Sequence, residues 1–208
     1  PMKVYLNTNY KMKKLEKIIN NTRMVDDSGK AADTLHGLVD LINHVGGLKN
    51  KKALEVGCFR GISSEVFLLH EPQEMYFVDV WGKNEGYVES NWALKQSSKD
   101  WDAIKSEFVE RTSPYKKNTD INIIHDFSSE ASKSISNNYF DFIYIDGDHS
   151  YQGVKTDISR WLTKLSKGGY FCGHDYTTTP DIRKACHEVF DENKIVTFSD
   201  SSFAIKVD

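Results

Sequence analysis

The apolar residues of this chain gather in short runs that are separated by longer amphipathic stretches. Short apolar runs bounded by turn residues are typical of buried strands. Residues 140–145 are almost wholly apolar, the pattern of a strand that is buried on both faces. Five strands of this kind are expected, at residues 53–56, 75–80, 121–124, 140–145 and 170–173.

The stretches between these runs repeat apolar residues at the spacing of an α-helix. A helix expected at residues 151–165 has Ser150 as its N-cap and Gly168-Gly169 as its C-terminal stop. Further helices are expected at residues 31–45, 63–70 and 182–190, and a helical pattern of Trp101, Ile104 and Phe108 lies inside the long connection 81–115.

Strands that alternate with helices indicate a mostly parallel, doubly wound α/β sheet of the Rossmann-like type. Two last runs, at residues 195–198 and 203–207, predict an antiparallel hairpin around the turn 199–202. We expect a single domain over residues 1–208, with a core at 48–208. Residues 1–47 are expected to form an N-terminal helical extension that, together with residues 81–115, covers the active site.

Ligands of such sheets bind beyond the carboxyl ends of the strands, where this chain places glycines and polar residues. The first strand leads into the loop Glu55-Val56-Gly57-Cys58-Phe59-Arg60-Gly61, and the second ends at Asp79. Glycines allow sharp turns and close approach to a ligand, and an acid at the second strand tip is placed to accept hydrogen bonds from a ribose diol. The combination indicates a nucleoside ligand; the glycine loop alone is equally compatible with an ordinary turn.

Two nucleoside classes compete for this loop. Dinucleotides favour G-x-G-x-x-G, whereas this chain has Phe59 at the middle glycine position. Glu55 precedes the loop, and an acid there suits the cationic S-adenosylmethionine better than a pyrophosphate. S-adenosylmethionine is therefore the expected cofactor. An NAD-dependent oxidoreductase and a non-catalytic nucleoside-binding module stay open as alternatives.

Three more strand ends carry candidate chemistry. His125-Asp126-Phe127 follows the third strand, Asp146-Gly147-Asp148-His149-Ser150-Tyr151 the fourth, and Gly173-His174-Asp175-Tyr176 the fifth. Adjacent strands bring the last two clusters within reach of each other, so carboxylates and imidazoles are expected to face one another across this edge of the sheet.

In the order of these motifs, the chain from about Leu48 to its end resembles the class I S-adenosylmethionine-dependent methyltransferases. The resemblance implies that the first loop surrounds the methionine part, that Asp79 binds the ribose and that Asp126 lies near the adenine amine. The implied cofactor-binding residues are Glu55, Gly57, Cys58, Phe59, Gly61, Asp79, Val80, Asp126, Phe127 and Asp146.

The fourth and fifth strand ends resemble the small-molecule and sugar O-methyltransferases, some of which bind a divalent metal such as Mg²⁺ or Mn²⁺. This resemblance implies Asp146, His174 and Asp175 as metal ligands and Asp148 as the general base. His174 departs from the pattern, since those relatives carry an acid there and imidazole suits Mg²⁺ poorly. Without a metal, His149 or His174 is the candidate base. Structural roles are open too: Asp148 as a helix cap and His149 bonded to backbone.

Other residues have less specific interpretations. Trp81 and Tyr87 are candidates to flank the adenine or the substrate, and Trp81 is equally compatible with the core. The helical spacing of Trp101 and Trp161 favours the core. Arg23 and Lys30 are expected on the surface.

Composition narrows the class of protein. The net charge of -3 over 208 residues does not favour a nucleic-acid partner, and no run is long enough to span a membrane. Three isolated cysteines, Cys58, Cys172 and Cys186, argue against a disulfide framework. We expect a cytoplasmic enzyme that acts on a small polar acceptor. A homo-oligomer is one of the assemblies that the sequence leaves open.

Overall fold

A seven-stranded mixed sheet forms the centre of the protein in the part of the chain that the structure describes. The structure is a computed structural model that describes residues 2–21, 35–82 and 100–208. The strand order is β3-β2-β1-β4-β5-β7-β6, and the first five of these strands are parallel. The bounds are β1 Lys52–Val56, β2 Glu74–Asp79, β3 Asp120–His125, β4 Phe140–Ile145, β5 Leu165–Gly173, β6 Val196–Thr197 and β7 Phe203–Lys206.

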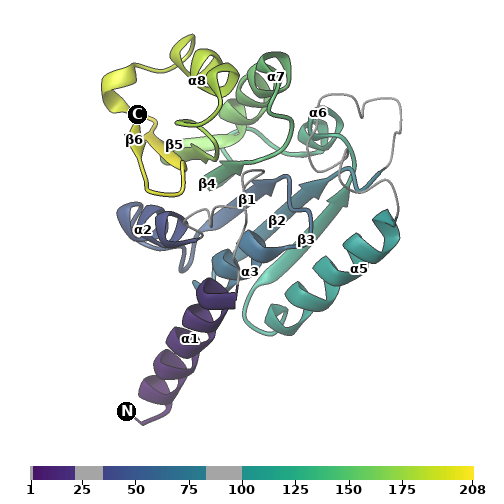
Figure 1. Ribbon diagram of the computed structural model, residues 1–208, viewed down its shortest axis with the longest axis vertical. Coiled ribbons are helices and arrows are strands. Elements are labelled where there is room, and N and C mark those ends of the chain that lie inside the picture. The colour runs from purple at the N-terminus through teal and green to yellow at the C-terminus, as the bar shows by residue number, and fades with distance from the viewer. Residues whose placement is uncertain (1, 22–34, 83–99) are drawn as a thin grey trace.

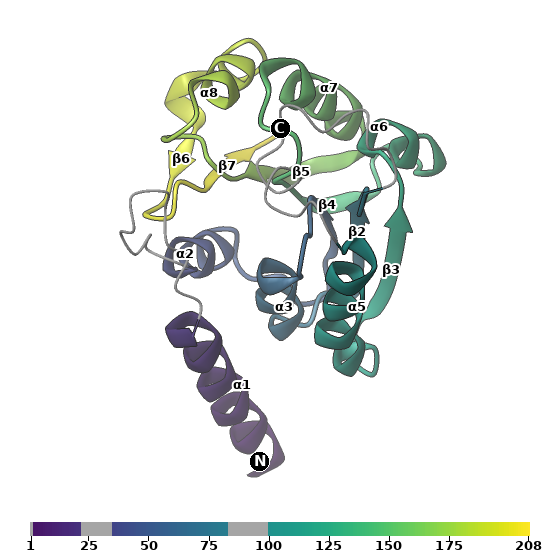
Figure 2. The ribbon, with the colours of Figure 1, turned by 45° about the vertical axis from the view of Figure 1, so that its right-hand side comes forward.

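Helices cover both faces of the sheet, as Figures 1 and 2 show. One layer holds α2 (His36–His44), α3 (Ile62–Leu69) and α5 (Trp101–Thr112), and the other holds α6 (Ser128–Ala131), α7 (Tyr151–Trp161) and α8 (Pro180–His187). Because β7 runs antiparallel to both β5 and β6, the chain ends in the expected hairpin. The predicted doubly wound α/β class is therefore confirmed.

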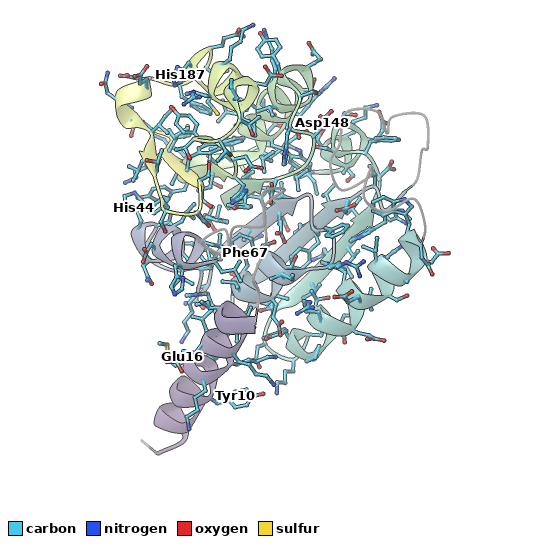
Figure 3. All side chains as sticks on the ribbon, viewed as in Figure 1. Tyr10, Glu16, His44, Phe67, Asp148 and His187 are labelled. Carbon is cyan, nitrogen blue, oxygen red and sulfur yellow. The ribbon has the colours of Figure 1, made fainter. Side chains whose placement is uncertain are left out.

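Two apolar clusters, one on each face, hold the layers together. Successive residues of a strand point to opposite faces, so Phe142 and Tyr144 of β4 share one face, and both pack on Phe67 of α3, which lies in the interior (Figure 3). The register with β5 shifts between Phe140 and Phe142, and Phe140 lies in the other cluster, where its ring approaches the fully buried Trp161. The expectation that β4 is buried on both faces and that Trp161 belongs to the core is confirmed.

The C-terminal end of α7 differs from the prediction. Ser150 is the N-cap as expected, since its side chain accepts a hydrogen bond from the N–H of Gly153. The helix ends at Trp161, however, and a short 3-10 turn leads into β5 at Leu165. Gly168 and Gly169 are therefore not a helix stop. They lie within β5, where the register with β4 shifts, and Gly168 takes a φ of 78° that favours glycine.

The N-terminal segment, which the hydrophobic pattern left unassigned, forms the long helix α1 (Met2–Asn21) beside α3. Leu15 and Ile18 pack on the core, while Lys14 forms an ion pair with the buried Glu65 of α3 at 3.0 Å. Arg111 and Tyr115 also donate to this carboxylate. The helix expected at residues 31–45 begins at His36 within the described residues, and the use of residues 1–47 as a cover stays a prediction.

None of the helices within the described ranges is both long and apolar enough to cross a membrane.

Candidate active site

The loop after β1 and the end of β4 touch each other at the carboxyl edge of the sheet. A Cβ placed on Gly57 would lie 2.0 Å from the carbonyl oxygen of Asp146 and 2.7 Å from the nitrogen of Gly147. Gly57 also has a φ of 86°. Only glycine fits both this backbone conformation and this close approach. The predicted cofactor loop and the predicted acidic cluster are therefore in direct contact.

The Asp79 carboxylate organises this loop. It accepts hydrogen bonds from the N–H groups of Cys58 at 2.7 Å, Phe59 at 2.8 Å and Trp81 at 2.8 Å. Hydrogen bonds from N–H groups to a carboxylate are stronger than those between neutral groups, so they fix the positions of both partners. The side chain expected to bind a ribose thus first fixes the backbone on either side of it, and ribose binding itself stays a prediction.

Phe59, at the position where a dinucleotide loop has its middle glycine, has the left-handed φ of 47°. Its N–H is held by Asp79, and its carbonyl accepts a hydrogen bond from the indole of Trp81 at 3.0 Å. These two bonds hold a conformation that a bulky residue rarely adopts. Trp81 is 3% exposed, which settles its two interpretations in favour of the core.

The side chain of Cys58 points away from the loop surface, because the thiol is buried and 3.6 Å from the carbonyl of Val78. Gly61 ends the loop with a φ of 77° and begins α3, as expected. Contact of Cys58 with a ligand would therefore come from its backbone.

Glu55 requires a correction. Its side chain is fully buried and accepts hydrogen bonds from the hydroxyls of Ser63 and Ser64, both at 2.5 Å. Burial, opposed by these bonds, raises the pKa of Glu55 to about 8, so the group is mainly protonated at neutral pH. The argument that a charged Glu55 attracts a cationic ligand does not hold in this structure. The residue instead ties β1 to the first turn of α3.

The predicted adenine end lies beyond β2 and β3. Asp126 and Phe127 are half-buried, and the Asp126 carboxylate accepts a hydrogen bond from the N–H of Phe127 at 2.8 Å. The carbonyl of Val80 is 2.8 Å from one ring nitrogen of His125, whose other nitrogen is 2.8 Å from Lys105. These contacts join the end of β2, which the sequence assigned to the ribose, to the end of β3, which it assigned to the adenine.

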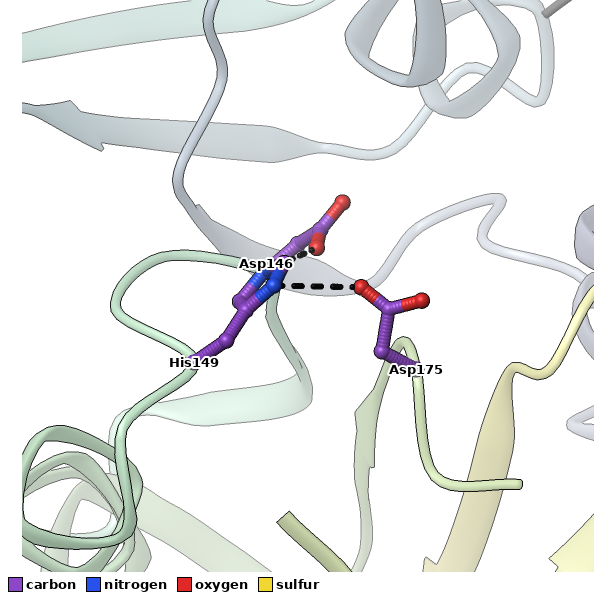
Figure 4. Close-up of side chains that lie close together, drawn as sticks. All are labelled: Asp146, His149 and Asp175. Carbon is purple, nitrogen blue, oxygen red and sulfur yellow. Dashed lines mark hydrogen bonds and ion pairs between the residues drawn. The ribbon is translucent and has the colours of Figure 1, made fainter. Parts of the chain in front are cut away.

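Three predicted site residues meet at the ends of β4 and β5, as Figure 4 shows. The imidazole of His149 lies between two carboxylates, with Nε2 3.2 Å from Asp146 and Nδ1 3.2 Å from Asp175. One ligand atom from each of the three residues falls within 4.8 Å of the others. Burial lowers the pKa of His149, but the hydrogen bond and charge of Asp146 and the charge of Asp175 outweigh it and raise that pKa above its usual value.

His174 stands beside this group. Its Nδ1 is 3.3 Å from Asp175 but 3.9 Å from Asp146. Burial opposes its protonation, yet the charge of Asp146 and the contact with Asp175 raise the pKa of His174 to about 9. Burial likewise opposes ionisation of Asp175, whose pKa nevertheless falls to about 2 because of His174.

The predicted metal set of Asp146, His174 and Asp175 stays a prediction, and the group of possible ligand atoms in the structure differs from it in one member. The loop after β4 turns His149 inward, between the two carboxylates, and the group that forms is Asp146, His149 and Asp175.

Asp148 points toward the helix that follows (Figure 3). Its carboxylate accepts the N–H of Ser150 at 2.9 Å, and a Cβ on Gly153 would lie 2.4 Å from its Cγ. The N-cap of α7 is Ser150, so Asp148 does not cap the helix as considered but bonds to the backbone of the cap residue. Its role as a base stays a prediction.

Several residues that the sequence singled out give no further information on the site. Trp101 is half-buried against Gly82, where an added Cβ would lie 2.2 Å from the indole. Arg23, Lys30 and Tyr87 lie outside the described residues.

The family described as "Methyltransferase domain" matches residues 54–176, which include every predicted site residue. A search of curated proteins found no match.

Solved structures with the same fold include several methyltransferases. The rhamnose O-methyltransferase CalS11 of calicheamicin biosynthesis is 12% identical with a TM-score of 0.59, and covers 95% of this chain and 93% of its own. The O-methyltransferase NovP is 15% identical with a TM-score of 0.57, and the match covers 94% of this chain and 79% of NovP. An rRNA methylase from Streptococcus thermophilus is 13% identical with a TM-score of 0.55, and the match covers 84% of this chain and 96% of the methylase. At these identities the likeness concerns the fold alone.

We predict that Glu55→Gln stabilises the protein at alkaline but not at acidic pH. The pKa of Glu55 is raised in the folded state, so between about pH 4.5 and 8 only the unfolded chain releases the proton, and stability falls as pH rises. Glutamine imitates the protonated acid toward both serines and removes this loss. Urea unfolding should show similar stabilities at pH 4.5 and a gain on the order of 1–3 kcal/mol for the variant at pH 8. Equal pH dependence of the two proteins would contradict the assignment.

Proposed function

Because this chain belongs to the methyltransferase domain family, we propose that it transfers a methyl group from S-adenosylmethionine to an oxygen of a small polar acceptor, such as a sugar. Family membership makes the chain an S-adenosylmethionine-dependent methyltransferase. The acceptor, the atom that is methylated and the use of a metal belong to the proposal.

One observation carries it: the cofactor loop abuts the cluster of Asp146, His149 and Asp175. Gly57 contacts the backbone of Asp146, while the side chain of Asp146 joins the cluster. A methyl donor over the loop and an acceptor hydroxyl at the cluster would thus face each other. Methyl transfer needs mainly such positioning, because the sulfonium is already an activated donor.

The donor half is assigned to the loop Gly57–Gly61, to Asp79 and Val80, and to Asp126 and Phe127. In this assignment the methionine part lies over the loop, the ribose at Asp79 and the adenine beside Asp126 and Phe127. Glu55 and the thiol of Cys58 support the loop from below, since both are buried.

A divalent cation fits the acceptor half. Two carboxylates and one imidazole within 4.8 Å of one another form a donor set that suits Mn²⁺ or Fe²⁺ better than Mg²⁺. Such an ion, when bound, would lower the pKa of an acceptor hydroxyl. His174 would then support Asp175 from outside the set.

The remaining requirement is a group that takes the hydroxyl proton. The pKa of His174 is raised to about 9, so without a metal this imidazole is mainly protonated at neutral pH and donates rather than accepts. The pKa of His149 is raised too, which favours its protonated form. We therefore retain Asp148 as the proposed base, because it is a carboxylate on the same loop as His149.

The cofactor assignment predicts that S-adenosylhomocysteine binds and that Asp79 contributes to its affinity. Asp79→Ala should weaken the Kd by about 10- to 100-fold, because it removes charge-assisted bonds that shape the loop. Asp79→Asn should weaken it too, since an amide nitrogen cannot accept from the N–H groups that the carboxylate holds. Isothermal titration measures both.

Asp120→Ala, which changes an exposed acid at the opposite end of β3, is the matched control and should bind as the wild type does. No binding to the wild type at millimolar S-adenosylhomocysteine would contradict the assignment.

The metal assignment predicts different effects for the two histidines. His149→Gln should weaken Mn²⁺ binding more strongly than His174→Gln, because the first removes a ligand and the second removes an outer partner of Asp175, a loss of about 10-fold. Titration followed by electron paramagnetic resonance of free Mn²⁺ gives both constants. A larger loss in His174→Gln would restore the set expected from sequence, and absence of Mn²⁺ binding to the wild type would exclude this ion.

A further inference from the structure

A buried carboxyl, Asp157 of α7, lies outside both halves of the proposed site. Its residue is only 5% exposed. A buried carboxyl lowers stability unless it has hydrogen-bonding partners, so its contacts indicate what it does.

On one side, Asp157 holds the segment after β3. The hydroxyl of Ser128 donates to Asp157 Oδ1 at 2.5 Å, and the indole of Trp161 donates to the Ser128 oxygen at 2.7 Å. Ser128 is the first residue of α6 and follows directly on Asp126 and Phe127, the pair assigned to the adenine. The Ser128 hydroxyl is thus bonded to two residues of α7, Asp157 and Trp161, and these two bonds fix the start of α6.

On the other side, Asp157 lies under the loop after β4. Its Oδ2 is 3.8 Å from the position of a Cβ on Gly147. Asp148 of the same loop packs against Gly153, one helical turn before Asp157. Asp157 therefore lies between two loops. One follows β3 and the other follows β4, and these two strands are not neighbours in the sheet.

We propose that Asp157 is a positioning residue that holds the loop 146–149 and the segment 126–128 at the spacing the adenine end of the cofactor requires. The inference rests on the proposed function, since it uses the assignment of residues 126 and 127. Asp157 itself acts through Ser128 and the loop backbone and does not touch the cofactor.

The chemistry of the carboxyl supports this role. Burial and the nearby charge of Asp148 raise the pKa of Asp157 to about 7, against the opposing bond from Ser128. A group with this pKa is about half protonated near neutral pH, and its protonated form carries one acceptor and one donor. Asparagine has the same shape and the same pair of groups, whereas alanine has neither.

The test is the Kd of S-adenosylhomocysteine, measured by isothermal titration at 15 °C with the full chain. Asp157→Ala should weaken binding by about 10- to 30-fold, while Asp157→Asn should stay within about threefold of the wild type. Ser128→Ala, which removes the same link from the other segment, should weaken binding by about three- to tenfold.

Ile205→Ala is the matched control for lost stability, because this core residue of β7 is 3% exposed and belongs to the same apolar cluster. It should lower Tm without changing the Kd. If Asp157→Ala does not fold, Ser128→Ala and Asp157→Asn still decide the question.

Three results would overturn the inference while leaving the proposed function intact: an unchanged Kd in Ser128→Ala and in a folded Asp157→Ala, an equal loss of affinity in Ile205→Ala, or an Asp157→Asn protein as weak as the alanine variant. Failure of the wild type to bind S-adenosylhomocysteine is a different result, because it would remove the proposed function and the inference with it.

Discussion

The close contact between the loop after β1 and the end of β4 is the constraint on which the rest of the site depends. Gly57 approaches the Asp146 carbonyl so closely that no side chain fits, and Asp79 holds the next two N–H groups of the loop. Both contacts follow from parallel strands that end at one edge of the sheet. Because the loop is fixed in this way, the site assigned to the cofactor and the acidic cluster share one wall.

The two halves of the site differ in their electrostatics. Beneath the loop, Glu55 is buried with a pKa raised to about 8, so this residue adds little charge to the donor half at neutral pH. At the cluster, the neighbouring His174 lowers the pKa of Asp175 to about 2 against the effect of burial, and His149 lies between the carboxylates of Asp146 and Asp175. A cationic methyl donor over the loop would therefore be attracted by the carboxylates of Asp79 and of the cluster, and not by Glu55. Binding of the donor and ionisation of the cluster are then linked, since the sulfonium charge is lost on transfer.

The sequence was sufficient to predict the sheet, the loop glycines and the two acidic strand ends, because these depend on local periodicity and on strands ending at a common edge. It was not sufficient for the choice between His149 and His174, since the turn of the loop after β4 decides which imidazole lies between the carboxylates. The protonation of Glu55 depends on Ser63 and Ser64 and on complete burial, which spacing does not reveal. Gly168 and Gly169 misled the prediction because an irregular strand uses glycine as a helix end does.

The fold is shared by enzymes that act on sugars and on RNA, so the acceptor has to be inferred from the site and not from the architecture. The central claim is that donor and acceptor meet between Gly57 and the cluster of Asp146, His149 and Asp175. A crystal structure with S-adenosylhomocysteine and Mn²⁺ tests it most directly. The account predicts the thioether sulfur beside the cluster, with the anomalous Mn²⁺ signal among the three side chains. A ligand bound away from the Gly57 loop, or one whose sulfur faces away from the cluster, would contradict it.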